Sequence, residues 1–262
     1  MRKMRLDLII MSRCLVESRS KAKGLIMAGQ VFVDGAMVDK AGTMLQQNCK
    51  IEIKKGMQYV SRGGIKLEAA LEAWSLSMKR MVCADVGIST GGFTDCMLQH
   101  GASRVYGIDV GKGIVHWKLR KDERVILLEN TNARYLTGLP EEPNFVAIDV
   151  SFISLRLVLD KVQGWLNESG RILALIKPQF EAGKKDVGKG GVVRSAKVHR
   201  EVIERILEHS IALGLKPLGL IKSPLIGPAG NKEFMTYLSN NTDIDAVETG
   251  KLIDNVMDEI DE

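Results

Sequence analysis

Residues 81–98 read MVCADVGISTGGFTDCML, and this stretch decides the fold that the sequence predicts. An apolar strand ends at a glycine-rich turn, and a helix begins immediately after the turn. Glycines allow backbone N–H groups to approach a ligand closely, and the first turn of a helix attracts negative charge. The spacing G-x-x-x-G-G differs from the dinucleotide pattern G-x-G-x-x-G, and no Walker G-K-[ST] follows it. The stretch therefore predicts a ligand site without identifying the ligand.

Strands and helices alternate on both sides of this stretch. We predict strands near residues 81–86, 104–109, 125–129, 145–150, 171–177, 217–222 and 233–239. Helices are predicted between them, notably at residues 64–74, 92–100, 154–166 and 196–213. Such alternation is typical of an α/β domain in which helices cover both faces of a mostly parallel sheet. In these sheets, ligands bind beyond the carboxyl ends of the strands.

A second acidic side chain follows the next strand. Asp109 ends that strand in VYGIDVGKG, where a carboxylate can accept hydrogen bonds from a ribose diol or simply be solvated. With Asp85 and the glycine-rich turn, it resembles the class I S-adenosylmethionine-dependent methyltransferases, which have a Rossmann-like, mostly parallel seven-stranded sheet. The resemblance implies that Asp109 holds the cofactor's ribose and that Asn132, in LENTNAR, contacts the adenine, although Asn132 also suits a turn. The remaining implied cofactor contacts are Asp85, Gly87, Ser89, Thr90, Gly91, Gly92, Phe93 and Asp149.

Four charged residues are predicted to meet at one edge of the sheet. Asp149 ends the fourth strand in VAIDVSFISL, and Lys177 ends the fifth in ILALIKPQFEAG. Glu233 opens the last strand, and Lys66 lies on the helix that enters the domain, in SRGGIKLEAAL. Because adjacent strands share the ligand crevice, Asp149 and Lys177 are expected to be neighbours. In order and placement, the four residues resemble the K-D-K-E tetrad of RrmJ/FtsJ-like RNA 2′-O-methyltransferases.

Residues 1–58 are predicted to form a separate small unit. Ser18 is a candidate N-cap for a basic helix, and Asp34-Gly35 in QVFVDGAMVD is a strong hairpin signal. The stretch RLDLIIMSRCLVESRSKAKGLIMAGQVFVDGAMVDKAG resembles the S4 RNA-binding domain, a small α+β unit. That resemblance implies that basic side chains neutralise RNA phosphates. The residues implied in RNA contact are Arg13, Arg19, Lys21 and Lys23.

An S4 domain joined to an FtsJ-like domain resembles the TlyA family, whose members are named both hemolysins and rRNA cytidine 2′-O-methyltransferases. The resemblance implies that S-adenosylmethionine methylates a ribose 2′-hydroxyl of ribosomal RNA, with a cytidine as the target. The hydroxyl must lose a proton while the methyl group moves in line from the sulfonium. Lysine is ordinarily protonated at neutral pH. Lys177 is therefore expected either to activate the hydroxyl as a base or to orient it as a cation.

Charge is unevenly distributed along the chain. The formal net charge is +5, but residues 242–262 carry −7, which leaves +12 on residues 1–241. Such an excess suits a polyanionic partner. The loop FEAGKKDVGKGGVVRS is expected to be a mobile lid that becomes ordered only with RNA, or otherwise a solvated flexible loop. Its predicted RNA-binding residues are Lys184, Lys185, Lys189 and Arg194.

These patterns divide the chain into four predicted parts. They are an S4-like domain at 1–58, a linker at 59–63, a methyltransferase domain at 64–241 and an acidic tail at 242–262. The tail is expected to end in one amphipathic turn or to stay disordered. The predicted partners are ribosomal RNA or ribosomal subunits, without DNA, and a monomer is favoured.

Other classes of protein are less well supported by the sequence. No apolar run approaches a membrane span, and Leu8–Met11 is too short for a secretory signal, so we expect a cytoplasmic protein without stable membrane insertion. No metal site is predicted, because zinc-type spacing is missing among Cys14, Cys49, Cys83 and Cys96. Two alternatives stay open: a membrane-active, hemolysin-like protein, and an RNA-binding protein with an inactive methyltransferase domain.

Overall fold

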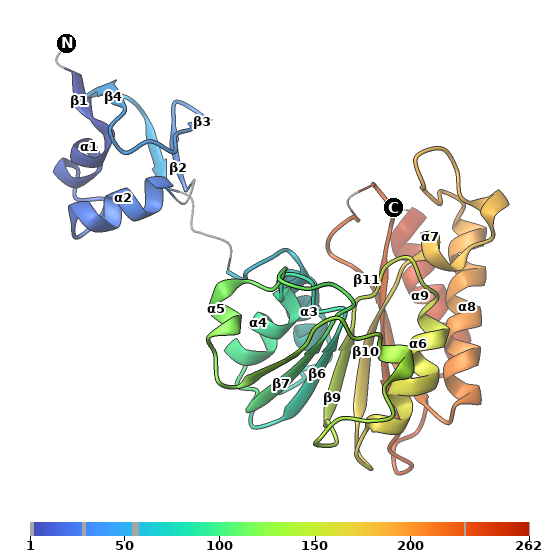
Figure 1. Cartoon of the computed structure of the whole chain (residues 1–262). Coiled ribbons are helices and arrows are strands. Elements are labelled where there is room, and N and C mark those ends of the chain that lie inside the picture. The colour runs from blue at the N-terminus through green and yellow to red at the C-terminus, as the bar shows by residue number, and fades with distance from the viewer. Residues whose placement is uncertain (1–2, 28–29, 54–57, 228, 262) are drawn as a thin grey trace. The chain divides into compact units, whose positions relative to one another are not determined.

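Figure 1 shows a computed structural model of the chain. The structure describes residues 3–27, 30–53, 58–227 and 229–261. The chain divides into two compact units, Met1–Gln58 and Tyr59–Glu262. Among the described residues, no helix has the length and apolar character needed to cross a membrane.

A seven-stranded sheet with strand order β11-β12-β10-β9-β6-β7-β8 forms the centre of the larger unit. The strands are β6 (Val82–Val86), β7 (Arg104–Ile108), β8 (Val125–Leu128), β9 (Phe145–Ile148), β10 (Arg171–Ile176), β11 (Lys216–Lys222) and β12 (Phe234–Ser239). β12 pairs antiparallel with both of its neighbours, whereas all other pairs are parallel. The predicted strands and the mostly parallel α/β sheet are confirmed.

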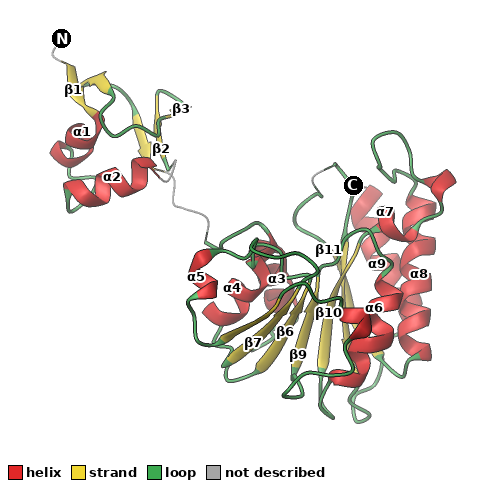
Figure 2. Ribbon diagram, in the orientation of Figure 1, coloured by secondary structure: helices red, strands yellow, loops and turns green. Residues whose placement is uncertain are grey.

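Helices cover both faces of this sheet (Figures 1 and 2). One face is covered by α3 (Gly63–Ala73), α4 (Gly92–Gln99) and α5 (Trp117–Arg120). The other is covered by α6 (Leu155–Val162), α8 (Ala196–Ala212) and α9 (Thr249–Asp261). The shorter elements are α7 (Pro178–Glu181) and the 3₁₀ turns η1 (Ala133–Tyr135), η2 (Gln163–Trp165) and η3 (Lys184–Asp186). The four predicted helices are confirmed, with the third passing from α6 into η2.

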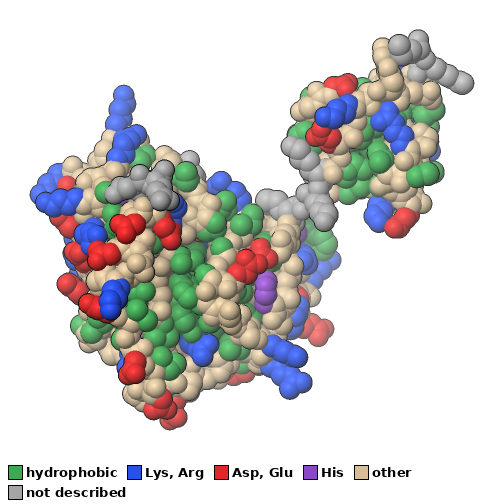
Figure 3. All heavy atoms as spheres, turned by 180° about the vertical axis from the view of Figure 1, so that it is seen from behind, with side chains coloured by type: hydrophobic (Ala, Val, Ile, Leu, Met, Phe, Trp, Pro, Cys, Tyr) green, Lys and Arg blue, Asp and Glu red, His purple; other side chains and the backbone are tan. Residues whose placement is uncertain are grey.

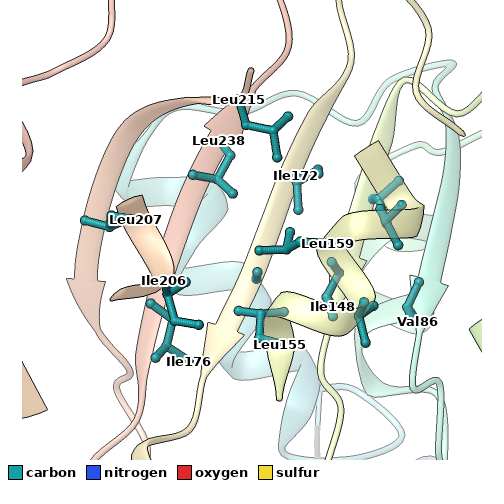
Figure 4. Close-up of a cluster of buried hydrophobic side chains, with 14 of the residues drawn as sticks. Val86, Ile148, Leu155, Leu159, Ile172, Ile176, Ile206, Leu207, Leu215 and Leu238 are labelled. Atoms are coloured by element: carbon teal, nitrogen blue, oxygen red, sulfur yellow. The ribbon is translucent and has the colours of Figure 1, made fainter. Parts of the chain in front are cut away.

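The core packs aliphatic side chains of the strands against α6 and α8 (Figure 4). Residues Ile172 to Ile176 of β10 are all buried, as expected for a strand that is covered on both faces. Burying one such side chain contributes about 1.5–3 kcal/mol. The sheet is therefore a rigid frame, and its carboxyl edge can hold side chains in fixed positions.

Tyr59 belongs to the core of the larger unit. Its side chain is 2% exposed and packs with α3, and its hydroxyl donates to Glu68 Oε1 at 2.8 Å. The ring lies so close to Gly64 that a Cβ added there would clash with it. Val60 N–H donates to the Asp95 carboxylate at 2.9 Å. The prediction of a linker at 59–63 is therefore wrong for these two residues, because they are packed and hydrogen-bonded.

The acidic tail ends in a packed helix. α9 has 13 residues, so the prediction of a single turn or disorder is wrong for Thr249–Asp261. Its apolar residues recur three and four positions apart, which places them on one face of a helix. That face packs into the core with α8 and β11. The buried side chains are Ile253, Val256 and Met257.

The smaller unit combines two helices with short strands. These are β1 (Lys3–Arg5), α1 (Leu6–Ser12), α2 (Arg19–Met27), β2 (Val31–Val33), β3 (Ala36–Met37), β4 (Met44–Gln46) and β5 (Ile51–Ile53). Ser18 Oγ accepts Lys21 N–H at 3.2 Å, as expected of a cap. Asp34 and Gly35 have φ values of 50° and 85° between the antiparallel β2 and β3, which confirms the predicted hairpin.

Candidate active site

Two adjoining cavities lie at the carboxyl edge of the larger sheet. Their volumes are about 600 Å³ and 550 Å³. Both are lined by Gly87, Ser89, Asp149, Ser151 and Phe152, so the end of β9 and the turn after β6 form their shared wall. We call the larger one the reaction cavity and the smaller one the second cavity. Together they place two binding regions side by side.

The glycine-rich turn needs its glycines for steric reasons. Gly87 has a φ of 87°, and a Cβ added there would clash with the carbonyl oxygen of Asp149. Gly91 has a φ of 98° and is the N-cap residue of α4. Left-handed backbone favours glycine because it has no Cβ. These glycines therefore allow the turn after β6 to pass directly against the end of β9.

Asp85 is a buried acid at the end of β6. Its side chain is 1% exposed, and its Oδ2 accepts both the backbone N–H and the hydroxyl of Thr94, at 3.0 Å and 2.7 Å. Burial raises the pKa of Asp85 to about 7, with a further contribution from the negative charge of Asp149, although the Thr94 hydrogen bonds act in the opposite direction. A cationic ligand group next to this carboxyl would therefore favour its ionised form.

The second cavity has polar side chains at the ends of β7 and β8. Asp109 accepts the N–H groups of Ser89 and Gly111, both at 2.8 Å, and these bonds fix its carboxylate beside the glycine-rich turn. Asn132 Oδ1 accepts Arg134 N–H at 3.1 Å and caps η1. Asp109 and Asn132 both line the cavity. Asn132 therefore has the turn role that the sequence left open and also lies where a ligand could contact it.

Lys177 and Asp149 form an ion pair at the edge of the sheet. They follow β10 and β9, which are adjacent and parallel, and Lys177 Nζ lies 2.5 Å from Asp149 Oδ1. Lys177 Nζ also donates to Ser151 Oγ at 3.0 Å. The Lys177 side chain is 11% exposed, so the amine is largely removed from bulk water. The expectation that these two residues are neighbours is confirmed.

Lys66 and Glu233 form a second ion pair in the same cavity. Because β12 is antiparallel and Phe234 pairs with Ile176, the residue before β12 lies at the edge where β10 ends. Lys66 Nζ, from α3, donates to Glu233 Oε2 at 2.6 Å, and their side chains are only 11% and 2% exposed. All four residues of the predicted tetrad line the reaction cavity. The structure thus gathers them as two ion pairs.

Sequence reasoning missed several residues of the reaction cavity. Phe152 is 91% exposed with a φ of 63°, and its ring centroid lies 5.0 Å from that of Phe180. Ser151 binds Lys177, and Asn231 lies at the cavity wall. Ser151 and Phe152 follow Asp149 at the end of β9, and this position beyond a strand's carboxyl end could have predicted that they line the cavity. Asn231 could not be predicted in this way, because it contacts Gly191 and Val193, which are distant from it in sequence.

Three of the four basic residues predicted to bind RNA in the smaller unit also bind other parts of the protein. Arg19 Nε donates at 2.9 Å to Asp7, whose side chain is fully buried. Arg13 donates to the carbonyl oxygens of Cys49 and Gln47. Lys21 lies 3.4 Å from Glu17, and Lys23 is exposed. The two arginines therefore help to hold the fold, and the RNA contact of all four residues stays a prediction.

The basic loop after β10 exposes its basic side chains, while its base, at Gly188, Val192 and Val193, is paired and packed. Lys184, Lys185, Lys189 and Arg194 are all exposed. Gly188 and Val192 form an antiparallel bridge, and Val193 is 2% exposed. The base of the loop is thus paired and packed, and the expectation that RNA orders the loop as a lid stays a prediction. On the face shown in Figure 3, the larger unit's basic side chains are interspersed with acidic ones, so charge alone marks no single patch there.

Within the part of the chain that the structure describes, no group of three or more His, Cys, Asp and Glu side chains could hold a metal ion.

Known proteins resemble the chain over nearly its whole length. The profile of the FtsJ-like methyltransferase family matches residues 59–240, and that of the S4 domain matches residues 4–48. A Bacillus subtilis protein named as a candidate rRNA methyltransferase, YqxC, is 47% identical over 244 residues, which cover 90% of this chain and 86% of that protein. The Mycobacterium tuberculosis 16S/23S rRNA (cytidine-2′-O)-methyltransferase TlyA is 39% identical over 246 residues, or 92% of each chain.

A solved structure agrees with these relatives. A Streptococcus thermophilus protein that carries the hemolysin name matches with a TM-score of 0.75 and 40% identity, covering 99% of this chain and 96% of that one. The family match spans the unit that holds both cavities, and the relatives span both units. The chain therefore belongs to the TlyA family of FtsJ-like methyltransferases, with an S4 domain beside its catalytic domain.

Proposed function

We propose that this protein methylates the ribose 2′-hydroxyl of a cytidine in ribosomal RNA, with S-adenosylmethionine as the methyl donor. The observation that carries the proposal is the convergence of two Lys–carboxylate pairs, Lys177–Asp149 and Lys66–Glu233, on one cavity. The name of the Mycobacterium tuberculosis relative, a 16S/23S rRNA (cytidine-2′-O)-methyltransferase, supports the choice of RNA and nucleotide. Ribosomal RNA or a ribosomal subunit is then the partner, and the cytoplasm is the proposed location.

The residues around the second cavity fit S-adenosylmethionine. Val110 and Ile114 line it and are 68% and 46% exposed, so apolar surface is available to an adenine ring. Asp109 is fixed at the same cavity, where its carboxylate can accept hydrogen bonds from ribose hydroxyls. Asp85 lines the adjoining reaction cavity with the glycine-rich turn, which suits a cationic amino-acid group. We propose these residues as the cofactor contacts.

The reaction cavity offers the groups that methyl transfer to a hydroxyl requires. When bound, the cofactor supplies an activated methyl group whose bond to sulfur breaks as the bond to the 2′-oxygen forms. We propose that Lys177 Nζ contacts that oxygen, and that Asp149 and Ser151 hold the amine in place. The hydroxyl proton leaves to the Asp149 carboxylate, either directly or through Nζ, which passes one of its own protons to Asp149 as it accepts the proton of the hydroxyl. Correct alignment of the two reacting groups supplies several kcal/mol of the barrier, by order of magnitude.

Lys177→Ala tests this proposal. The variant should lose at least about a hundredfold in methyl transfer to ribosomal RNA, because a positioned proton-transfer group typically contributes that much. Binding of S-adenosylmethionine should change less than about twofold, because Lys177 is held by Asp149 and Ser151 and not by the cofactor contacts proposed above. Transfer of labelled methyl groups to isolated ribosomal subunits measures the first quantity, and calorimetry measures the second.

Lys197→Ala is the matched control, because this lysine of α8 is 83% exposed and does not line either cavity. It should retain full activity. Near-normal transfer by Lys177→Ala would overturn the role given to Lys177. Absence of transfer by the unaltered protein to either subunit would overturn the proposed substrate.

A further inference from the structure

We propose that Asn231 is a positioning residue that holds the loop 188–193 against the reaction cavity. The activity readout of this inference rests on the proposed RNA methylation, whereas its structural readouts do not. Asn231 is two residues before Glu233 and is 2% exposed. A contact between Asn231 and the loop thus connects the loop to the segment that carries Glu233.

Both polar atoms of the Asn231 side chain bind the loop backbone. Nδ2 donates to the carbonyl oxygen of Gly191 at 2.9 Å, and Oδ1 accepts the N–H of Val193 at 3.0 Å. A side-chain amide is suited to this task, because it presents one donor and one acceptor side by side. A carboxylate offers only acceptors, and an aliphatic side chain offers neither group.

A second buried side chain binds the backbone of the same residue, Val193. His199, in the first turn of α8, is 1% exposed and its Nε2 lies 3.1 Å from the carbonyl oxygen of Val193. A carbonyl can only accept, so Nε2 carries the hydrogen. Burial lowers the pKa of His199, which favours the neutral ring. Val193 is thus bound through both its N–H and its C=O.

The tip of the loop has little packing of its own. Gly190 and Gly191 have φ values of 78° and 76°, and a Cβ added to either would meet no atom within 4 Å. Both glycines nevertheless line the reaction cavity. Two exposed cations, Lys189 and Arg194, flank this part of the chain. We infer that the Asn231 contacts fix the position of the loop 188–193 at the cavity wall. They thereby also fix the positions of Lys189 and Arg194 when RNA binds.

Asn231→Asp tests the inference with little change in shape. It removes the donor to Gly191, so the loop should open about tenfold more often, as expected for losing one buried hydrogen bond. The kcat/KM for ribosomal RNA should fall about tenfold, while the Kd for S-adenosylmethionine stays within about twofold. The Asn231 side chain bonds to the loop backbone rather than to a proposed cofactor contact. Trypsin cleavage after Lys189 in the folded full-length protein should rise by a similar factor.

Gly191→Ala provides a second route to the same result. Its φ of 76° disfavours a side chain, although space for the Cβ is free, so only the loop backbone is strained. It should reproduce the loss of RNA turnover and the faster cleavage. If a large drop in melting temperature shows that Asn231→Asp is unfolded, Gly191→Ala alone tests whether the position of the loop controls RNA turnover.

Asn240→Asp is the matched control. Asn240 directly follows β12, at its opposite end from Asn231, and its Nδ2 donates to the carbonyl oxygen of Asn167 at 2.8 Å. The same chemical change there should leave cleavage after Lys189 and RNA turnover unaltered. Unchanged cleavage in both loop variants, or cofactor binding that weakens as much as RNA turnover, would overturn the inference. An unaltered protein that methylates no RNA would contradict the proposed function, while the cleavage result would still judge the role of Asn231.

Discussion

At the scale of single residues, Arg19 and Lys23 lie on one face of a helix but differ in role: Arg19 neutralises a buried acid, and Lys23 is available to RNA. They are four positions apart on α2, but Arg19 binds the fully buried carboxylate of Asp7, while Lys23 is exposed. Burial by itself raises the pKa of Asp7, yet the hydrogen bonds and charges of Arg5 and Arg19 outweigh it and lower the pKa overall. The spacing of two cations along a helix places them on one face but does not show which of them neutralises a buried acid.

Arg19→Ala should destabilise the smaller unit by about 1–3 kcal/mol, because it leaves a buried charged acceptor short of a partner. Hydrogen exchange of the α1 amides in the full-length protein measures this change. Lys23→Ala is the control and should leave the exchange rates unaltered. Since the folded pKa of Asp7 lies below its ordinary value of 3.8, its contribution is present above that pH and is lost as the pH falls through the lowered pKa. An Arg19→Ala protein with unchanged exchange would contradict the structural role.

Asp85 should have the opposite pH dependence. Its folded pKa is raised from 3.8 to about 7 by burial, so the folded protein holds a proton that the unfolded chain has released. Stability should therefore fall as the pH rises from about 4 to 7 and then level off. Asp85→Asn cannot titrate, so it should melt at a higher temperature than the unaltered protein at pH 8, with no gain near pH 4. Melting curves across this range measure the effect, and a gain that is independent of pH would exclude Asp85 as its source.

At the scale of elements, the regular strands and helices were predictable, whereas the packing of the irregular segments was not. The strand ends placed Asp149 and Lys177 together because parallel neighbours end at one edge. The helix α9 could not be predicted from the composition of residues 242–262, which includes eight acidic side chains. Composition averages over both faces of a helix and so does not reveal an apolar face. The Asn231 contacts join segments 38 and 40 positions apart in sequence, and only the folded chain brings such segments together.

Ile253→Ala should lower the stability of the larger unit by about 2–5 kcal/mol, because it opens a cavity in the core beside α8 and β11. Thermal unfolding of the full-length protein measures the change. Asn255→Ala is the control, since this neighbour on α9 is exposed. Equal melting temperatures for the two variants would mean that α9 does not contribute to the core.

At the scale of the whole molecule, each of the two compact units exposes cations that a polyanion such as RNA can contact. The body of the chain has a net charge of +12, and exposed cations such as Lys23 and Lys184 lie in different units. Each phosphate that a cation neutralises releases counterions, so binding should weaken steeply with added salt. The two units can then contribute to affinity independently of each other.

Lys23→Ala and Lys184→Ala should each reduce the slope of log K against log salt concentration by about 0.7–0.9, and the double variant by the sum. Titration of ribosomal RNA at several salt concentrations measures the slopes. Lys251→Ala is the control, because this exposed lysine of α9 pairs with Glu248. An unchanged slope in either single variant would remove that residue from the RNA contact.

The position of β12 has a consequence for the order in which the protein is made. β12 is the last strand in the sequence, but it lies inside the sheet, between β10 and β11. During synthesis, the strands from β6 to β10 can pair before residue 234 leaves the ribosome, while β10 keeps one open edge. Glu233 arrives with that final strand and meets Lys66, which was made 167 positions earlier. A nascent chain therefore cannot assemble the complete set of charged residues until residue 233 and the strand after it have been translated.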